Sequence, residues 1–199
     1  MSSNAIDFGA LTGQKDTKAA PVDVDGFLNS AQQASTLISN SKDMLWKATA
    51  NADDIAQLDA QRKAANDIAD PKEKASKLQQ IQASQDTQLA VALDDKSKQA
   101  QLTSAKGDKQ KNINGAIYNF VLGSLKDTQL LGQGKDLVKG LAGNPANISK
   151  LGQVNGIVSS LAGQVDTMTK ITGSITKLAT TAKIELPKSA ADVPKDTSI

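Results

Sequence analysis

The sequence predicts an all-helical protein, and three observations carry that prediction. Apolar residues recur at alternating steps of three and four, which is the spacing of one helix face. Residues that end and start helices punctuate the chain at three points, namely Asp70-Pro71, Gly107-Asp108 and Gly143-Asn144-Pro145. Aromatic residues make up only 3% of the 199 residues, so Leu, Ile, Val and Ala must fill the core.

The first helix is expected over about 24–69, with Asp23 or Asp25 as its cap. Its apolar stripe starts at Phe27 and continues to Ala69 without an intervening Gly or Pro. The sequence Ala50-Asn51-Ala52-Asp53 leaves open whether this helix is continuous through Asn51.

The second helix is expected over about 71–106, because Pro fits the first helical turn and disfavours a helical residue before it. Polar residues fall on its apolar stripe, at Gln85, Lys96 and Gln99. We therefore expect it to be the helix that faces solvent most.

The third helix, about 109–142, carries a wide apolar face and is expected to lie centrally. The fourth, about 145–184, has the most regular stripe, with a mean step of about 3.4 residues from Ile148 to Ala182. That step is close to the 3.5-residue repeat of helices packed along their whole length.

Turns of two or three residues make consecutive long helices run antiparallel. The expected architecture is therefore an elongated, antiparallel, up-down-up-down four-helix bundle over residues 22–186. Residues 1–21 and 187–199 are polar and lack periodicity, which is typical of a flexible leader and a flexible tail.

The composition lacks most of the residue types that enzymes use for catalysis. The chain has no His and no Cys, and its only glutamates are Glu73 and Glu185, so imidazole bases, thiolate nucleophiles and Cys/His metal sites are excluded. We expect no enzyme activity and assign no catalytic, cofactor-binding or metal-binding residue. Nucleic acid is disfavoured as a partner, because Arg62 is the only Arg and stacking aromatic residues are few.

Two small sets of residues are candidates for contacts. Trp46, Arg62 and Tyr118 are nearly alone of their kind, and we take them as possible surface-contact residues. Glycines on the fourth helix are expected to form a close-packing seam, at Gly152, Gly156 and Gly163.

Lysines gather beside two turns, at Lys72, Lys74 and Lys77 and at Lys106, Lys109 and Lys111. Consecutive turns lie at opposite ends of a bundle, so a solvated surface is favoured there over an anionic lipid surface.

The amino terminus resembles a known class of protein. Met1-Ser2-Ser3-Asn4 followed by a polar tether is similar to the mature portion of a bacterial lipoprotein of the outer-membrane type, in which a lipidated Cys precedes Ser-Ser-Asn. Met1 would then stand in place of that Cys. The resemblance implies a lipid-anchored protein of the periplasm and outer membrane; a secreted or a cytoplasmic location stays open.

The resulting functional hypothesis is a non-enzymatic structural or interaction protein of a bacterial cell envelope. It would be a helical rod tethered by its N-terminus, with other envelope proteins or itself as partners. Two alternatives remain. One is a carrier of a lipid or another apolar ligand between its helices. The other is a secreted helical protein that acts on membranes.

Overall fold

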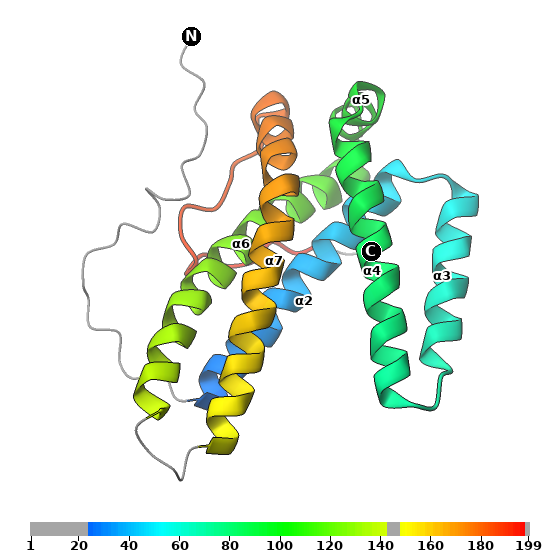
Figure 1. Cartoon of the computed structure of the whole chain (residues 1–199). Coiled ribbons are helices and arrows are strands. Elements are labelled where there is room, and N and C mark those ends of the chain that lie inside the picture. Colours follow the sequence, from blue (N-terminus) through cyan, green and yellow to red (C-terminus); the bar gives the residue numbers. More distant parts are fainter. Residues whose placement is uncertain (1–23, 143–147, 198–199) are drawn as a thin grey trace.

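A computed structural model describes residues 24–142 and 148–197, excepting the side chains of 164–167 and 170. Within these residues the chain forms only helices, which confirms the all-helical class (Figure 1). The helices are α2 (Val24–Thr49), α3 (Ala52–Asn66), α4 (Pro71–Asp94), α5 (Lys96–Thr103), α6 (Gly107–Leu141) and α7 (Ile148–Ala182). The predicted leader, 1–21, and the turn at 143–145 lie outside the described residues.

The predicted first helix, 24–69, is divided at Asn51 into α2 and α3. Asn51 has an extended backbone, with ψ of 171°, and its side-chain oxygen accepts a hydrogen bond of 2.8 Å from the N–H of Asp54. This cap replaces the backbone acceptor that a continuous helix would supply. Asp53 and Asp54 in the first turn add negative charge where the helix dipole favours it.

The predicted second helix, 71–106, is wrong as a single element, because Asp95 divides it into α4 and α5. The backbone of Asp95 is extended, with ψ of 120°, and its carboxylate accepts from the N–H groups of Ser97 and Lys98. A short acidic side chain that bonds to nearby N–H groups competes with helix continuation. The start of α4 agrees with the prediction, because Asp70 caps it and Pro71 occupies its first turn.

The third helix begins at Gly107, two residues earlier than predicted. Gly107 has φ of 62°, a left-handed conformation that glycine adopts at little cost. The break predicted near this position is therefore confirmed.

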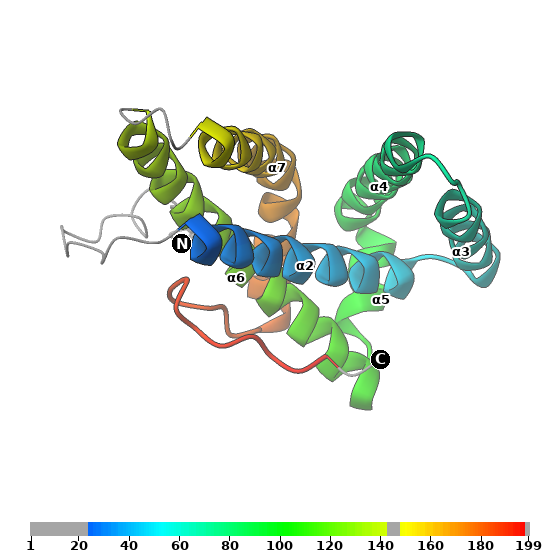
Figure 2. The ribbon, with the colours of Figure 1, turned by 90° about the horizontal axis from the view of Figure 1, so that it is seen from below.

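The helices pack around α6, which lies against both α2 and α7. Gly134 of α6 faces Phe27 and Gly123 faces Ile38, so α6 and α2 run antiparallel. Helices α3 and α4 form a hairpin to one side of α2, and α4 meets α7 only toward one end (Figures 1 and 2). The predicted bundle of four continuous antiparallel helices is not confirmed, because two of the four are divided and α4 stands apart from much of α7.

The apolar core has two parts. One cluster joins the ends of α2 and α6 with α7 and includes Phe27, Leu130 and Leu161. The larger cluster draws on every described helix and includes Phe120 and Ile175. The α7 stripe is buried at most of its described positions, but Ile148 is 68% exposed, because it stands at the first position of that helix.

The predicted close-packing seam on α7 is not found. A Cβ atom added at Gly152, Gly156 or Gly163 would meet no heavy atom within 4 Å. Close approach occurs on α6 instead, where a Cβ at Gly123 would lie 2.5 Å from Cγ1 of Ile38. The glycine spacing on α7 could not reveal this, because it does not say which face a neighbouring helix covers.

These two environments give opposite expectations for alanine. Gly152→Ala should raise the free energy of unfolding by about 0.5–1 kcal/mol, because helix propensity improves without a clash. Gly123→Ala should lower it by about 1–2 kcal/mol, because Ile38 and the helix backbone must shift. Urea denaturation followed by circular dichroism measures both. Equal effects of the two substitutions would contradict the packing described for α6.

The segment predicted as a flexible tail is packed against α6 in its described part. We call residues 184–197 the strap; it follows α7 and lies along α6 (Figure 2). The side-chain amide of Asn119 donates to the carbonyl of Lys195 at 2.8 Å, and its oxygen accepts from the N–H of Lys195 at 2.7 Å. The prediction failed because a polar segment without periodicity can still be fixed by side chains of another element.

Candidate functional site

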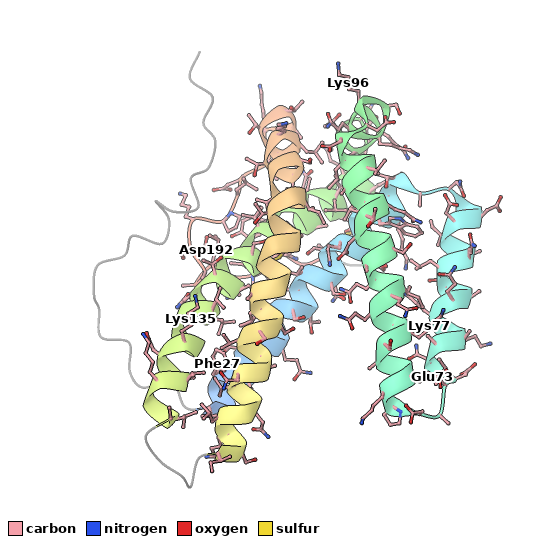
Figure 3. All side chains as sticks on the ribbon, in the orientation of Figure 1. Phe27, Glu73, Lys77, Lys96, Lys135 and Asp192 are labelled. Atoms are coloured by element: carbon pink, nitrogen blue, oxygen red, sulfur yellow. The ribbon has the colours of Figure 1, made fainter. Side chains whose placement is uncertain are left out.

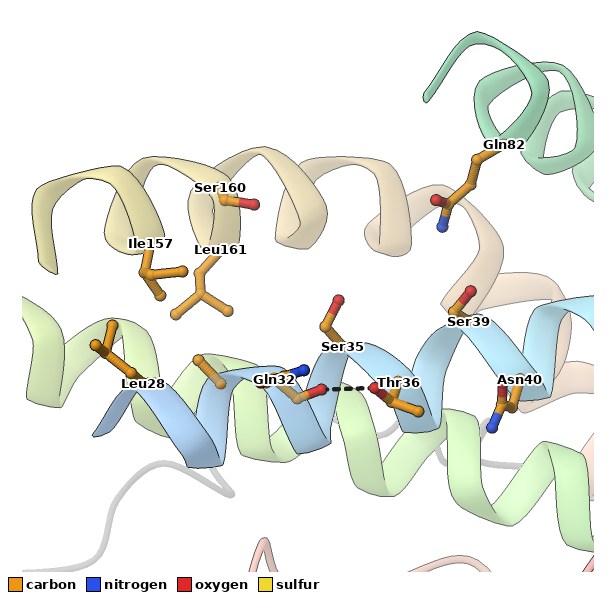
Figure 4. Close-up of a pocket in the computed structure, with 11 residues that line it drawn as sticks. Leu28, Gln32, Ser35, Thr36, Ser39, Asn40, Gln82, Ile157, Ser160 and Leu161 are labelled. Atoms are coloured by element: carbon orange, nitrogen blue, oxygen red, sulfur yellow. Dashed lines mark hydrogen bonds between the residues drawn. The ribbon is translucent and has the colours of Figure 1, made fainter. Parts of the chain in front are cut away.

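The candidate site is an open groove of about 540 Å³, which we call the α2 groove (Figure 4). Helix α2 forms its floor, α7 supplies one wall through Ile157 and Ser160, and Gln82 of α4 projects from the other side. The groove exists because α4 and α7 approach each other toward one end and diverge along α2 (Figures 1 and 2).

The lining of the α2 groove is uncharged and mostly polar. Seven of its eleven residues carry hydroxyl or amide groups: Gln32, Ser35, Thr36, Ser39, Asn40, Gln82 and Ser160. The apolar lining residues gather where the start of α2 meets α7, at Leu28, Ile157 and Leu161 (Figure 4). Ala31, the fourth, belongs to the same apolar cluster as Leu161. The groove thus offers hydrogen-bonding groups along most of its length and an apolar surface at one end.

The wall formed by α4 is held to α2 by a network of polar side chains. Asp43 of α2 accepts hydrogen bonds from Arg62 of α3 at 2.7 Å and from Gln85 of α4 at 2.9 Å. Arg62 also donates to the side-chain oxygen of Gln85 at 2.9 Å, which closes a triangle across three helices. Next to it, Lys42 pairs with Asp86 at 2.7 Å. These bonds fix where the α3–α4 hairpin stands relative to the groove floor.

Hydrogen bonds keep the Asp43 carboxylate of this network ionised. Burial on its own would raise the pKa of Asp43, and it is the largest single influence on that carboxylate. Hydrogen bonds from Gln85, Arg62 and Lys47 outweigh it together and hold the pKa below the ordinary value of 3.8. The Asp43 carboxylate is therefore charged at neutral pH and attracts the single Arg of the chain.

A second buried carboxyl group has the opposite character. Asp127 of α6 is fully buried, and neither of its oxygens has a hydrogen-bond partner in the described part of the chain. It lies on the α6 stripe of Gly123 and Gly134, at the boundary between the two core clusters. Burial raises its pKa to about 7, since an apolar surrounding disfavours the charged form.

None of the predicted surface-contact residues lies in the α2 groove. Trp46 is 4% exposed and donates from Nε1 to Gln88 of α4 at 3.0 Å, so it belongs to the helix packing. Arg62 is half-buried in the network described above. Tyr118 lies under the strap, with Nζ of Lys195 4.5 Å from its ring centre. Rarity in the sequence was a poor guide, because large side chains with polar ends are also useful for joining helices.

The groove residues themselves carry no signal that the sequence analysis could use. Ser35, Ser39 and Gln82 are ordinary polar residues on helix faces that the apolar pattern leaves to solvent. Their grouping depends on the angle between α4 and α7. The lysines beside the two predicted turns face solvent, as expected. Lys74 is half-buried, and the others are exposed, including Lys77, which Figure 3 labels on α4.

No group of three or more acidic side chains that could hold a metal ion occurs within 24–142 and 148–197. Among the described helices, none is both long enough and apolar enough to cross a membrane. Comparison with protein-family models, curated proteins and solved structures finds no match to this chain.

Proposed function

We propose that this protein is a non-enzymatic interaction protein that binds a segment of a partner protein in the α2 groove. The observation that supports this best is the groove itself, a space of about 540 Å³ bordered by three helices. A rigid setting for it is provided by the Asp43–Arg62–Gln85 triangle, which ties the α3–α4 hairpin to α2. Fixed positions reduce the entropy that binding would otherwise cost.

The chemistry of the lining suggests which kind of segment fits. Hydroxyl and amide groups such as those of Gln32 and Ser39 can donate and accept, so they suit a polar peptide or helix face without net charge. Ile157 and Leu161 offer a place for one apolar anchor at the end of the groove. We therefore propose an amphipathic helix with an uncharged polar stripe as the occupant.

We also propose that the protein acts in a bacterial cell envelope, tethered by its amino terminus. This part rests on the resemblance of Met1-Ser2-Ser3-Asn4 to the start of mature lipoproteins. The native gene should then encode a signal sequence followed by a Cys directly before Ser2, in the place of Met1. A gene without that Cys would remove the lipid anchor from the proposal and leave groove binding untouched.

The alternative of a lipid carrier receives less support from the groove. Apolar ligands are held in pockets lined mainly by apolar side chains, whereas most of this lining is polar. The alternative of membrane action would require α6 and α7 to separate, and their contact includes buried side chains such as Phe120 and Met168.

Site-specific photo-crosslinking in cells of the native host tests groove binding. A benzophenone amino acid at Ser35, in the groove, should give one discrete protein adduct. The same group at Gln57, an exposed position of α3 outside the groove, should not give that adduct. Ser39→Trp, which fills the groove from its floor, should abolish the Ser35 adduct. Equal labelling at both positions, or an adduct that survives Ser39→Trp, would contradict the proposal.

A further inference from the structure

The strap contacts α6 in the way that a bound peptide contacts a receptor. Asn119 uses both ends of its amide on one residue, donating to the carbonyl of Lys195 at 2.8 Å and accepting from its N–H at 2.7 Å. Lys126 donates to the carbonyl of Ala190 at 2.6 Å. These contacts recognise main-chain groups, so they depend on the path of the strap's backbone more than on a particular side chain.

The surface beneath the strap is shaped for close approach. A Cβ atom at Gly115 would lie 2.6 Å from Cγ2 of Thr197, so a side chain at this position would displace Thr197 where the strap passes. Tyr118 is 9% exposed and carries Lys195 over its ring at 4.5 Å, a cation–π contact. Asn119 itself is 4% exposed. If the strap leaves, this face loses its cover.

The strap joins α7 through a residue in a costly conformation. Lys183 has φ of 54°, in the left-handed region that favours glycine. The N–H of Ile184 bonds to the carbonyl of Ala179 at 2.9 Å, which closes the end of α7. A change at Lys183 to an ordinary backbone conformation relieves this strain and redirects the whole strap, so Lys183 can serve as a hinge.

We propose that this α6 face, centred on Gly115, Tyr118 and Asn119, is a peptide-docking site that also accepts the strap of a second copy of the chain. The strap of a second copy has the same sequence, so it offers the same main-chain groups to Asn119 and Lys126. The α6 face is therefore already complementary to it. Within one chain the short tether favours the chain's own strap at low concentration. Exchange between copies therefore produces dimers at high local concentration, as on a crowded surface. This inference is independent of the α2 groove.

Mixing two full-length variants tests the exchange. Asn119→Ala damages the docking site and leaves the strap intact, whereas Lys195→Pro removes the N–H that Asn119 binds and leaves the site intact. At roughly 0.5 mM, near the effective concentration of a short tether, the mixture should contain at least about five-fold more dimer than either variant alone. Sedimentation equilibrium measures the dimer, and mass spectrometry shows that it holds one chain of each kind.

The matched control is Asn119→Ala mixed with a chain that carries both Asn119→Ala and Lys195→Pro, which leaves no intact site. A dimer in this control, or none in the test mixture, overturns the proposal. Circular dichroism must first show that each variant is folded. If Asn119→Ala unfolds, Asn119→Asp replaces it, because its carboxylate keeps the acceptor for the N–H but cannot donate to the carbonyl of Lys195.

Discussion

Asp127→Asn should make the free energy of unfolding nearly independent of pH between pH 5 and pH 8. Over the same interval, the free energy of unfolding of the parent chain should fall by about 2–3 kcal/mol. The reason is the position of Asp127, which is fully buried without a hydrogen-bond partner among the described residues. Its pKa of about 7 in the folded chain compares with 3.8 for an ordinary aspartate.

The direction follows from which state binds the proton more tightly. A raised pKa means that the folded chain keeps a proton that the unfolded chain releases. The stability that Asp127 contributes is therefore fully present below pH 3.8, falls as the pH rises from there to about 7, and is lost above that pH. Asparagine has nearly the same shape and does not titrate, so this fall should disappear.

Urea denaturation at pH 5, 6, 7 and 8 measures the effect. The matched control is Asp136→Asn, since Asp136 lies on the same helix with its side chain 80% exposed, and its replacement should leave the pH dependence unchanged. Parallel pH profiles for the parent chain and Asp127→Asn would show that the carboxyl group is ionised and stabilised in the folded chain.

Arg62→Ala should lower the free energy of unfolding by about 2–3 kcal/mol at neutral pH. The change leaves the half-buried Asp43 carboxylate without its guanidinium partner and Gln85 without the donor at its side-chain oxygen. The value is below that of a fully buried pair, because the Arg62 side chain is 31% exposed and water screens it. Hydrogen exchange should accelerate mainly in α3 and the part of α4 that faces it.

The pH dependence of the stability lost in Arg62→Ala distinguishes the contribution of the ion pair with Asp43 from the contribution of side-chain packing. Asp43 has a lowered pKa, so its contribution is present above pH 3.8 and is lost as the pH falls further. The difference between Arg62→Ala and the parent chain should therefore shrink at pH 2–3. Arg62→Lys serves as the control, since it keeps the charge and cannot make both bonds at once. A difference that stays constant with pH would assign the loss to packing of the aliphatic part of Arg62.

The helix predictions succeeded and failed for one reason, which is that helix ends are set by residues close together in the sequence. The stripe from Phe27 to Leu45 is buried as its spacing indicates, and Asp70 with Pro71 starts α4 as expected. Helix ends depend on neighbouring residues, which are visible in a sequence. The divisions at Asn51 and Asp95 also depend on residues close together in the sequence. The apolar pattern did not decide them, because a single Asn or Asp within a long apolar stripe is consistent with either a helix interior or a helix cap.

The strap and the buried Asp127 could not have been predicted in this way. Asn119 bonds to Lys195 across 76 residues of sequence. Asp127 is one acid among many, and its neighbours along the chain, Lys126 and Thr128, are polar. Its environment becomes apolar only when α2 and α7 cover that face of α6.

The sequence alone determined that this protein is helical, that α4 begins at Pro71, and that His and Cys side chains are absent. These properties depend on composition and on residues a few positions apart. The tertiary structure decided the α2 groove, the polar triangle beside it, the docking of the strap and the two contrasting carboxyl groups. Each of these depends on contacts between residues far apart in the chain, and such contacts also set the angles at which the helices cross.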